Sequence, residues 1–226
     1  MLYAGEHLRG ADFARSDAAV RAWSADLLRC LNVEVAAGGL DASGPVPASG
    51  RLLVSNHRSM LDVLVLLSRF GGHMLSKNDL AGWPVVRDLA AIAGTLYVDR
   101  SAKASGAVAI RQVAERLGQG RVVTVFPEGT TFPDDEVRPF HAGAFLAAIR
   151  GGAEVLPVGL AYREPVATYF QEPLGVHGRR VFSAPSIRVA LHVGAPMPSK
   201  DRTTKRLAAE AHDAVQDLVT AARGSL

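Results

Sequence analysis

Cysteine, lysine and long hydrophobic runs are scarce in this sequence, and each scarcity excludes a class of protein. Cys30 is the single cysteine, so no internal disulfide can form, and a reducing compartment fits the chain. The densest apolar run, Leu61–Leu67, is far shorter than the ~18 residues of a membrane-spanning helix. The first residues show no apolar segment behind a basic one. We therefore expect neither a membrane-spanning helix nor a signal peptide.

An excess of charge of one sign is also lacking, because basic and acidic residues are nearly equal in number. Lysine and arginine total 25 against 22 acidic residues, which gives a net charge of +3. Only four of the basic residues are lysines, and arginine is the better ligand for phosphate and carboxylate groups. Because no basic run carries interleaved aromatic residues, we expect no nucleic-acid partner. The weak positive charge is compatible with an anionic membrane surface or an anionic substrate.

The composition is otherwise typical of a globular domain, with 226 residues, 48% of them hydrophobic and 21% charged. Short apolar runs alternate with segments of helical spacing. This pattern predicts a single α/β domain with a central mixed, largely parallel sheet flanked by helices. The expected strands are 31–35, 52–55, 74–76, 96–98, 122–126, 155–160 and 187–193, and the expected helices are 61–70, 84–93, 104–117, 143–149 and 201–222.

The N-terminal part has a helical pattern of its own. Residues 16–31 carry apolar side chains at helical spacing. The segment fits either a helix packed on the core or an amphipathic helix lying on a membrane. We therefore divide the chain into an N-terminal amphipathic helical segment, residues 1–30, and one α/β domain, residues 31–226.

A histidine and a carboxylate stand five residues apart just after the expected strand 52–55. On one regular helix His57 and Asp62 would be rotated by about 140° from each other, so they can meet only if the helix begins after His57. One interpretation is structural: Ser59 and Asp62 form a variant of the capping box, and His57 is a loop histidine. The other is a general base oriented by a carboxylate, because a neutral imidazole accepts a proton near pH 7.

Three further segments place polar residues, glycine or proline within or after expected strands. Phe126–Thr130 ends the strand 122–126, where α/β sheets build their sites, and it equally fits a turn. Gly94–Arg100 ends in an Asp–Arg pair, which fits a binding site or a surface ion pair. Val155–Gly159 contains Pro157, which predicts an edge strand, a bend or a bulge.

Together and in this order, the four segments resemble the motifs of the glycerolipid acyltransferases, the 1-acylglycerol-3-phosphate acyltransferase family. Residues 56–62 match N-H-x-x-x-x-D, and residues 94–100 match G-x-x-[FY]-[IV]-x-R. Residues 126–130 match F-P-E-G-T, and residues 156–158 match the final proline-containing strand. The resemblance extends over residues 24–195 and identifies 31–226 as an acyltransferase domain.

The resemblance implies transfer of a fatty acyl group from acyl-CoA or acyl carrier protein to the free hydroxyl of a lysophospholipid. We expect lysophosphatidic acid to be converted to phosphatidic acid. His57 would be the catalytic base and Asp62 would orient it. The substrate-binding residues carried over from the motifs are Lys77, Arg100, Glu128, Gly129 and Thr130. No cofactor is implied beyond the acyl donor, and the scattered histidines show no metal-ligand spacing.

Other functions remain open. Thr131 and Phe132 follow the F-P-E-G-T block where the family commonly has arginine and serine, so another acceptor, such as a lyso-ornithine lipid, is an alternative. A thioester hydrolase would use Ser55 or Ser59 with His57, although neither serine lies in G-x-S-x-G. A non-catalytic lipid-binding protein is a third class. Because acyl substrates and products reside in bilayers, we expect peripheral attachment at the cytoplasmic face of a membrane.

Overall fold

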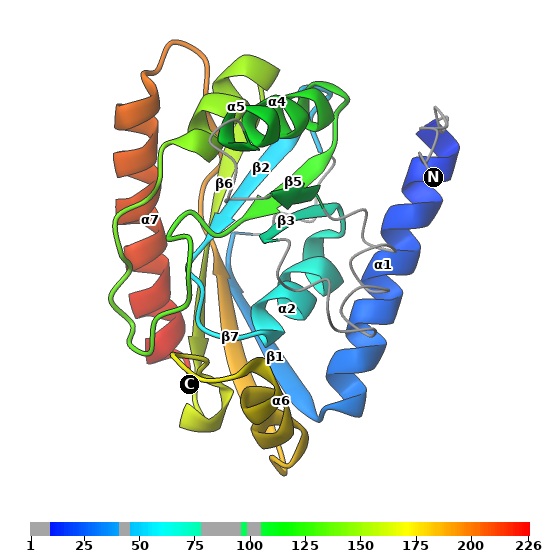
Figure 1. Ribbon diagram of the computed structural model, residues 1–226, viewed down its shortest axis with the longest axis vertical. Helices are drawn as coiled ribbons and strands as arrows, with labels where there is room; N and C mark the ends of the chain where they lie inside the picture. Colours follow the sequence, from blue (N-terminus) through cyan, green and yellow to red (C-terminus); the bar gives the residue numbers. More distant parts are fainter. Residues whose placement is uncertain (1–9, 41–45, 78–95, 99–104) are drawn as a thin grey trace.

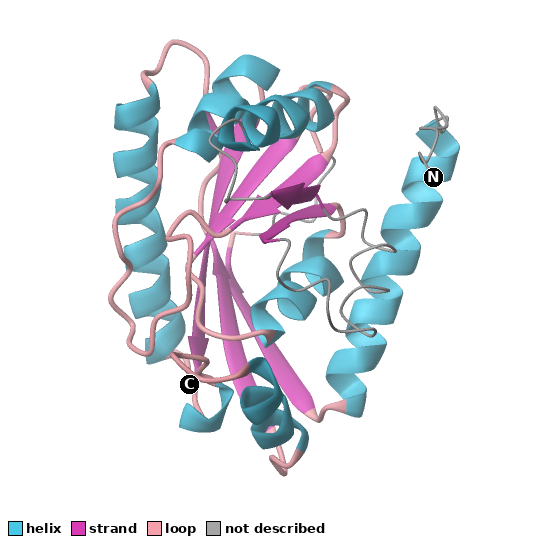
Figure 2. Cartoon of the chain, in the orientation of Figure 1, coloured by secondary structure: helices cyan, strands magenta, loops and turns pink. Residues whose placement is uncertain are grey.

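The computed structural model of the chain describes residues 10–40, 46–77, 96–98 and 105–226. In these residues one β-sheet is covered by helices on both faces (Figures 1 and 2). The strands are β1 (Val33–Gly39), β2 (Arg51–Ser55), β3 (His73–Lys77), β4 (Leu96–Val98), β5 (Val122–Val125), β6 (Glu154–Tyr162), β7 (Ile187–Val193) and β8 (Met197–Pro198). The helices are α1 (Gly10–Cys30), α2 (Leu61–Phe70), α4 (Ser105–Gly118), α5 (Gly143–Gly151), the 3-10 helix η2 (Pro165–Ala167), α6 (Leu174–Phe182) and α7 (Thr204–Gly224).

The sheet confirms the expected fold class. Its strand order is β1-β7-β6-β2-β5-β3-β4, and β8 adds to β6. β2 pairs in parallel with both β5 and β6, while β6 pairs antiparallel with β7 and β8. The sheet is therefore mixed and largely parallel, and its middle strands β6, β2 and β5 carry or precede three of the four sequence motifs, whereas β4 of the fourth lies at the edge.

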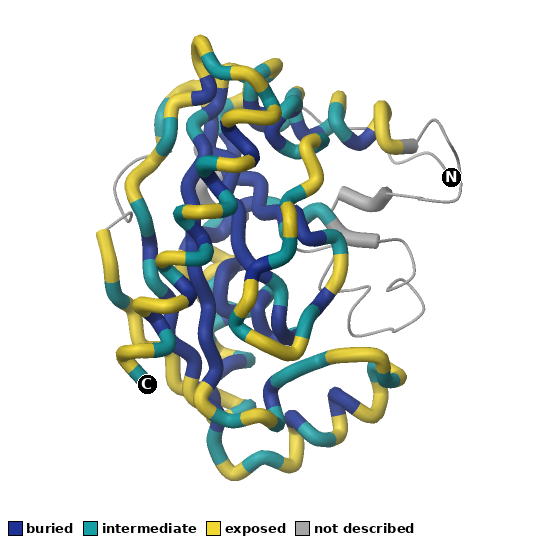
Figure 3. Tube along the Cα trace, turned by 90° about the vertical axis from the view of Figure 1, so that its left-hand side faces the viewer, coloured by how far each residue is buried: buried dark blue, intermediate teal, exposed yellow. Residues whose placement is uncertain are grey.

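The core forms two layers because the middle strands are buried on both faces. In β2, Leu52 and Val54 pack with residues of α4, α5 and α7, whereas Leu53 packs on the opposite face with α2, α6 and the end of α1. Strands buried on both faces have nearly continuous apolar sequences, which is why β2 and β5 were recognisable. Figure 3 shows the buried residues along these inner strands and exposed residues along the outer helices.

Most expected elements are confirmed, and the differences have local reasons. α2 begins and ends at the residues that the spacing predicted, and the expected helix 84–93 lies outside the described residues. The sequence pattern predicted no element in 163–186, where η2 and α6 lie. α6 has nine residues, and only His177, Gly178 and Val181 are buried, so it lacks an apolar stripe. β8 is a two-residue extension of the sheet.

Pro157 lies inside the sheet, so an edge position for it is wrong. β6 has β2 on one side, and on the other it pairs with β8 at Glu154 and Val155 and with β7 from Val158 onward. The carbonyl of Pro157 accepts the Gly194 N–H at 3.0 Å, in the gap between these two partners. Because the N–H and C=O of a strand residue point to the same side, the missing donor of Pro157 faces this interruption.

α1 begins at Gly10, six residues earlier than the spacing predicted. Val20 of α1 packs with Leu67 and Met74, and Leu28 joins the core around α2, so the apolar stripe is directed at the protein. The geometry favours the packed interpretation of this helix, and the boundary at residue 30 stays a prediction. In the described part of the chain, every helix is too short or too polar to cross a bilayer.

Gly159 offers a test of how α7 packs on the sheet. A Cβ at this position would lie 2.4 Å from the carbonyl carbon of Leu218 and 2.5 Å from the nitrogen of Val219, both backbone atoms of α7. Backbone cannot rotate away, so Gly159→Ala should lower the free energy of unfolding by about 3 kcal/mol in urea denaturation. Gly106→Ala is the control, because a Cβ there meets no atom within 4 Å. Equal stability of the two variants would contradict the close approach.

Candidate active site

The N-H-x-x-x-x-D and F-P-E-G-T segments meet at the carboxyl ends of two middle strands. His57 follows β2 and Phe126 follows β5, and these strands are parallel neighbours, so their carboxyl ends meet. The imidazole of His57 stacks on the ring of Phe126, with centroids 3.9 Å apart and planes inclined by 7°. This contact fixes the plane of the imidazole against the end of the neighbouring strand.

Asn56 anchors the chain just before the histidine. Its side-chain Nδ2 donates to the carbonyl of Leu160 at 2.9 Å, and its Oδ1 accepts the N–H of Leu160 at the same distance. The amide thereby satisfies both backbone groups of a β6 residue, as a strand residue would. It fixes the end of β2 to β6, and so it fixes where His57 leaves the sheet.

His57 and Asp62 meet, as the sequence predicted for a helix that begins after the histidine. Nδ1 of His57 lies 2.8 Å from Oδ2 of Asp62. The capping interpretation is confirmed in part: the Ser59 hydroxyl accepts the Leu61 N–H at 3.2 Å and Oδ2 of Asp62 accepts the Ser59 N–H at 2.9 Å, but the residue directly before α2 is Met60. The same carboxylate therefore begins α2 and orients the imidazole.

Asp62 is fully buried and accepts four hydrogen bonds. Besides His57 and Ser59, the N–H of Arg58 donates to Oδ2 at 2.6 Å and the hydroxyl of Tyr162 donates to Oδ1 at 2.6 Å. Four donors support an ionised carboxylate, which can only accept. Nδ1 of His57 therefore carries the proton and Nε2 carries the lone pair. None of the described residues bonds to Nε2, and 21% of the His57 side chain is exposed.

Glu128 holds the motif loop together. Oε1 accepts the His57 N–H at 2.8 Å, and Oε2 accepts the Arg138 N–H at 2.9 Å. Burial raises the pKa of Glu128, although the two backbone N–H groups oppose this shift. Gly129 supplies the turn, because its φ of +79° favours glycine and its N–H donates to the Phe126 carbonyl at 3.1 Å. A substrate contact for Glu128 or Gly129 stays a prediction.

The structure describes the positions of some, but not all, of the remaining expected site residues. Thr130 lines a pocket of about 630 Å³, and Lys77 is the last residue of β3, opposite Val98 of β4. Arg100 lies outside the described residues. The other residues that line the pocket are Thr131, Phe132, Tyr169, Phe170, Gln171 and Glu172. Within the described part of the chain, no three His, Cys, Asp or Glu side chains gather where they could hold a metal ion.

The pocket adjoins the histidine through backbone contacts. The N–H of Phe132 donates to the His57 carbonyl at 3.1 Å, and the N–H of Tyr169 donates to the Arg58 carbonyl at 2.8 Å. The two segments that form the pocket are therefore attached to the residues that carry the imidazole.

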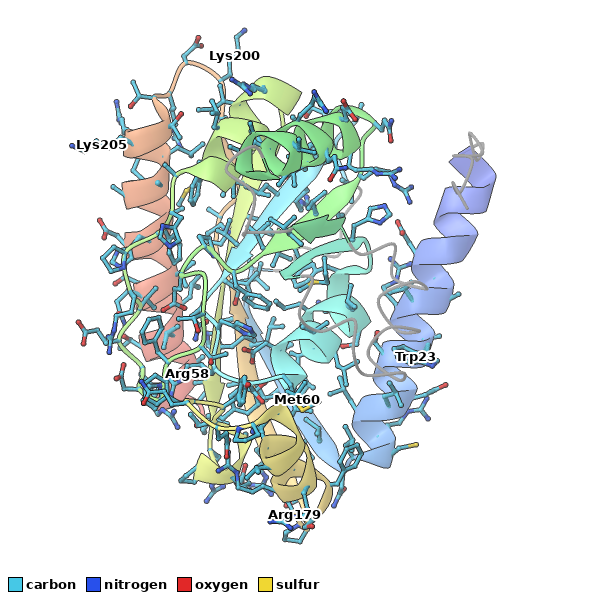
Figure 4. The ribbon with its side chains drawn as sticks, in the orientation of Figure 1. Trp23, Arg58, Met60, Arg179, Lys200 and Lys205 are labelled. Carbon is cyan, nitrogen blue, oxygen red and sulfur yellow. The ribbon has the colours of Figure 1, made fainter. Side chains whose placement is uncertain are left out.

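A network of charged side chains stabilises the loop that contains Pro133 and Asp135. The sequence did not reveal this network. The buried guanidinium of Arg58 binds the Asp135 carboxylate and donates to the Pro133 carbonyl at 2.8 Å. Arg223 of α7 binds Asp135 at 2.6 Å and the Tyr162 carbonyl at 2.6 Å. Figure 4 shows Arg58 directed at the C-terminal part of α7, with Met60 between α2 and α6.

The network sets the protonation of its carboxylate. Burial alone would raise the pKa of Asp135, but the hydrogen bonds and charges of Arg223 and Arg58 outweigh it and hold that pKa below its ordinary value. Arg58 lies inside the N-H-x-x-x-x-D motif, so its position was marked in the sequence. Nothing in the sequence marked Asp135, Arg223 or Tyr162, because each is an ordinary residue far from the motif.

Asp135→Asn should lower the free energy of unfolding by about 2 kcal/mol at pH 7, since it leaves the buried Arg58 without its counter-ion. A depressed native pKa stabilises the fold above the unfolded pKa of about 3.9 and loses that effect as pH falls through the native value. Urea denaturation of wild type and variant should therefore converge below about pH 4. Asp134→Asn, on the exposed side of the loop, should cost less than about 1 kcal/mol. A difference that is independent of pH would contradict the assignment.

Comparison with known proteins places this geometry in a family. The family model described as Acyltransferase matches residues 41–161. A lyso-ornithine lipid O-acyltransferase from Pseudomonas aeruginosa is 33% identical over 218 residues, which are 93% of this chain and 82% of that protein. A 1-acyl-sn-glycerol-3-phosphate acyltransferase from Neisseria gonorrhoeae is 32% identical over 163 residues, 70% of this chain and 62% of that protein.

The fold has a counterpart among solved structures. The crystal structure of the 1-acyl-sn-glycerophosphate (LPA) acyltransferase PlsC from Thermotoga maritima matches with a TM-score of 0.73 and 21% identity. The match covers 96% of this chain and 84% of that chain. Because the family model spans more than half of the chain and a relative matches nearly all of it, the chain belongs to the acyltransferase family.

Proposed function

We propose that this protein transfers a fatty acyl group from a thioester of coenzyme A or acyl carrier protein to the hydroxyl of a lysolipid. The observation that carries the proposal is the oriented imidazole: Nδ1 of His57 is 2.8 Å from the buried Asp62 carboxylate, which directs the Nε2 lone pair away from Asp62. An imidazole held in this way can accept the proton of an alcohol. No cofactor beyond the acyl donor is needed.

The reaction balances on these residues alone. The acceptor hydroxyl gives its proton to Nε2 of His57 while its oxygen attacks the thioester carbonyl. A carbon–oxygen bond forms, the carbon–sulfur bond breaks, and the protonated imidazole returns the proton to the leaving sulfur. The imidazolium that forms in between is stabilised by the ionised Asp62, as in other His–Asp pairs.

The side-chain geometry disfavours the hydrolase alternative. Ser55 is fully buried, and its hydroxyl lies 3.4 Å from the Asn56 side-chain oxygen. Ser59 is also fully buried, and its hydroxyl caps Leu61 and lies beside His177. Both hydroxyls are therefore engaged away from His57, and neither is presented to a thioester in solution.

Two acceptors are named among the relatives, and we place lyso-ornithine lipid first. The relative of that name matches 93% of this chain. In addition, the loop offers Thr131 and Phe132 where the family's arginine would meet a phosphate, and Arg138 lies over the Phe132 ring at 5.0 Å with its guanidinium paired to Asp134. An ornithine headgroup, which combines an ammonium with a carboxylate, needs less positive charge than a phosphate monoester.

Lysophosphatidic acid is the second candidate acceptor. The Neisseria gonorrhoeae relative supports it by name, and so do the four motifs. Arg100 and Lys77 are the cations that would hold its phosphate. Arg58, the arginine nearest the dyad in sequence, is paired with Asp135 instead.

An acceptor panel with purified protein tests the proposal. Acyl-CoA and acyl carrier protein thioesters are supplied in turn with lyso-ornithine lipid, lysophosphatidic acid and lysophosphatidylethanolamine, and the acylated product is quantified. His57→Ala should lower the rate by about 10²–10⁴-fold, the contribution of a general base. His192→Ala, which removes a β7 histidine that pairs with the Ser225 hydroxyl and has no bond to the dyad residues, should keep the wild-type rate.

Two results would contradict the proposal. One is a His57→Ala variant that transfers acyl groups at the full rate. The other is thioester cleavage that proceeds equally well without any acceptor, which would indicate a hydrolase. Preference for lysophosphatidic acid would reverse the order of the two acceptors and leave the reaction itself unchanged.

We also propose peripheral attachment at the cytoplasmic face of a membrane through α6. Phe182 is 68% exposed and Val176 is 43% exposed, and Arg179 lies on the same outer side of this helix. Figure 4 shows Arg179 pointing away from the body of the protein. Exposed apolar side chains beside a cation fit the interface of an anionic bilayer. The buried side of α6 carries His177, which contacts Ser59, so this surface lies next to the dyad.

Flotation with phosphatidylglycerol–phosphatidylethanolamine vesicles tests the α6 surface. Phe182→Asp should lower the membrane-bound fraction about tenfold, because a buried phenyl ring is worth roughly 1.5–3 kcal/mol. Val108→Asp is the matched control, since Val108 is 38% exposed on α4, away from α6. If wild type and both variants float alike, α6 is not the contact surface.

A further inference from the structure

The buried side of Asp62 carries a contact that the proposed chemistry does not use. Three of the four hydrogen bonds to this carboxylate come from residues 57–59 and end on Oδ2. The fourth ends on Oδ1 and comes from the Tyr162 hydroxyl, at 2.6 Å and 100 residues away in the sequence. Tyr162 closes β6 and is buried, so it touches the reacting atoms only through Asp62.

The phenol is held as a donor. Burial and the adjacent Asp62 carboxylate raise the pKa of Tyr162 well above its ordinary value, so its proton stays on the oxygen. The nearby Ser59 hydroxyl opposes this rise in the pKa of Tyr162 and lies 3.4 Å from Nε2 of His177. The phenol donates its hydrogen bond to Asp62.

His177 completes this side of the site without adding charge. Its Nδ1 lies 3.2 Å from a guanidinium nitrogen of Arg180, which can only donate, so the imidazole proton belongs on Nε2, toward Ser59. Burial, aided by Arg180, lowers the pKa of His177 to about 4. It is neutral at pH 7 and does not compete with His57 for the charge of Asp62.

We propose that Tyr162 is a positioning residue that controls His57 as a base through the Asp62 carboxylate. The inference rests on the proposed function, in which Nε2 of His57 accepts the proton. A strong donor on Oδ1 draws negative charge away from Oδ2, and Oδ2 is the atom that stabilises the imidazolium. Tyr162 thus limits how strongly Asp62 stabilises a protonated His57.

Removal of the phenol oxygen has a predictable sign. In Tyr162→Phe the donors from residues 57–59 still hold Oδ2 in place, so the carboxylate keeps its orientation and its charge concentrates on Oδ2. The imidazolium of His57 is then better stabilised. The acid limb of kcat/KM against pH should move upward by about 0.5–1 pH unit, a loss of about three- to tenfold at acidic pH. The alkaline plateau and KM should change less than about twofold, because Tyr162 does not meet the substrate.

Other charges near the dyad stay the same in this variant. Among the described residues, the titratable and charged groups that face His57 and Asp62 from neighbouring elements are Glu128, Arg58 with Asp135, and His177 with Arg180 and Glu172. None of them bonds to the phenyl ring that remains. A shift of the acid limb therefore reports the lost hydroxyl.

The experiment combines a pH–rate profile with NMR titration of His57 in the protein without substrate. Thr124→Val is the control, because it also removes a buried hydroxyl while keeping the shape, and Thr124 has no hydrogen-bond partner among the described residues. It should leave the acid limb and the titration of His57 unchanged. Incorporation of 3,5-difluorotyrosine at residue 162 makes the phenol a stronger donor and should move both midpoints to lower pH. This variant keeps the ring packing if Tyr162→Phe folds poorly.

The outcomes separate the inference from the proposed function. A folded Tyr162→Phe protein with an unchanged acid limb and an unchanged His57 titration overturns the inference. So does a rate loss that is equal at every pH, which would mean a purely structural role. If wild type acylates no lysolipid, the proposed function fails, but the NMR titration still decides whether Tyr162 acts on His57 through Asp62.

Discussion

The structure depends on one buried carboxylate. Asp62 accepts hydrogen bonds from the turn after β2, from the imidazole of His57 and from the end of β6, and it has no exposure to solvent. Burying an unpaired charge would be very costly, so these donors together stabilise the fold as well as the site. The start of α2 and the orientation of the His57 imidazole therefore both depend on Asp62. A change that disturbs one of them also disturbs the other.

The rest of the site follows the same rule: polar side chains replace missing backbone partners. Asn56 completes the hydrogen bonds of Leu160, and Glu128 accepts the N–H groups of His57 and Arg138. Such contacts fix loops that have no secondary structure of their own. Asn56 and Glu128, both residues of the sequence motifs, therefore hold loops in place. The sequence alone did not reveal this structural task, and the side-chain geometry does.

Features set by residues close together in the sequence could be predicted, whereas features set by contacts between distant residues could not. The bounds of α2 and the meeting of His57 with Asp62 could be predicted because helical spacing and the turn lie within a few residues. The sequence left Pro157 open between an edge strand, a bend and a bulge, because the interruption between β7 and β8 that it faces is distant in the chain and leaves no local trace. Tyr162 and His177 could not be found either, since a single tyrosine or histidine carries no pattern until the sheet brings it to Asp62.

The distance along the chain between Asp62 and Tyr162 has a consequence for synthesis. The 100 residues that separate them take about 5–20 s to translate at ~5–20 residues per second. During that interval His57 and Asp62 have already been synthesised, but β6 is still incomplete. The chain therefore lacks the Tyr162 donor to Asp62 and the Leu160 backbone groups that anchor Asn56. A ribosome-bound chain therefore carries the dyad without its support. The full set of hydrogen bonds to Asp62 therefore forms late, together with the completed sheet.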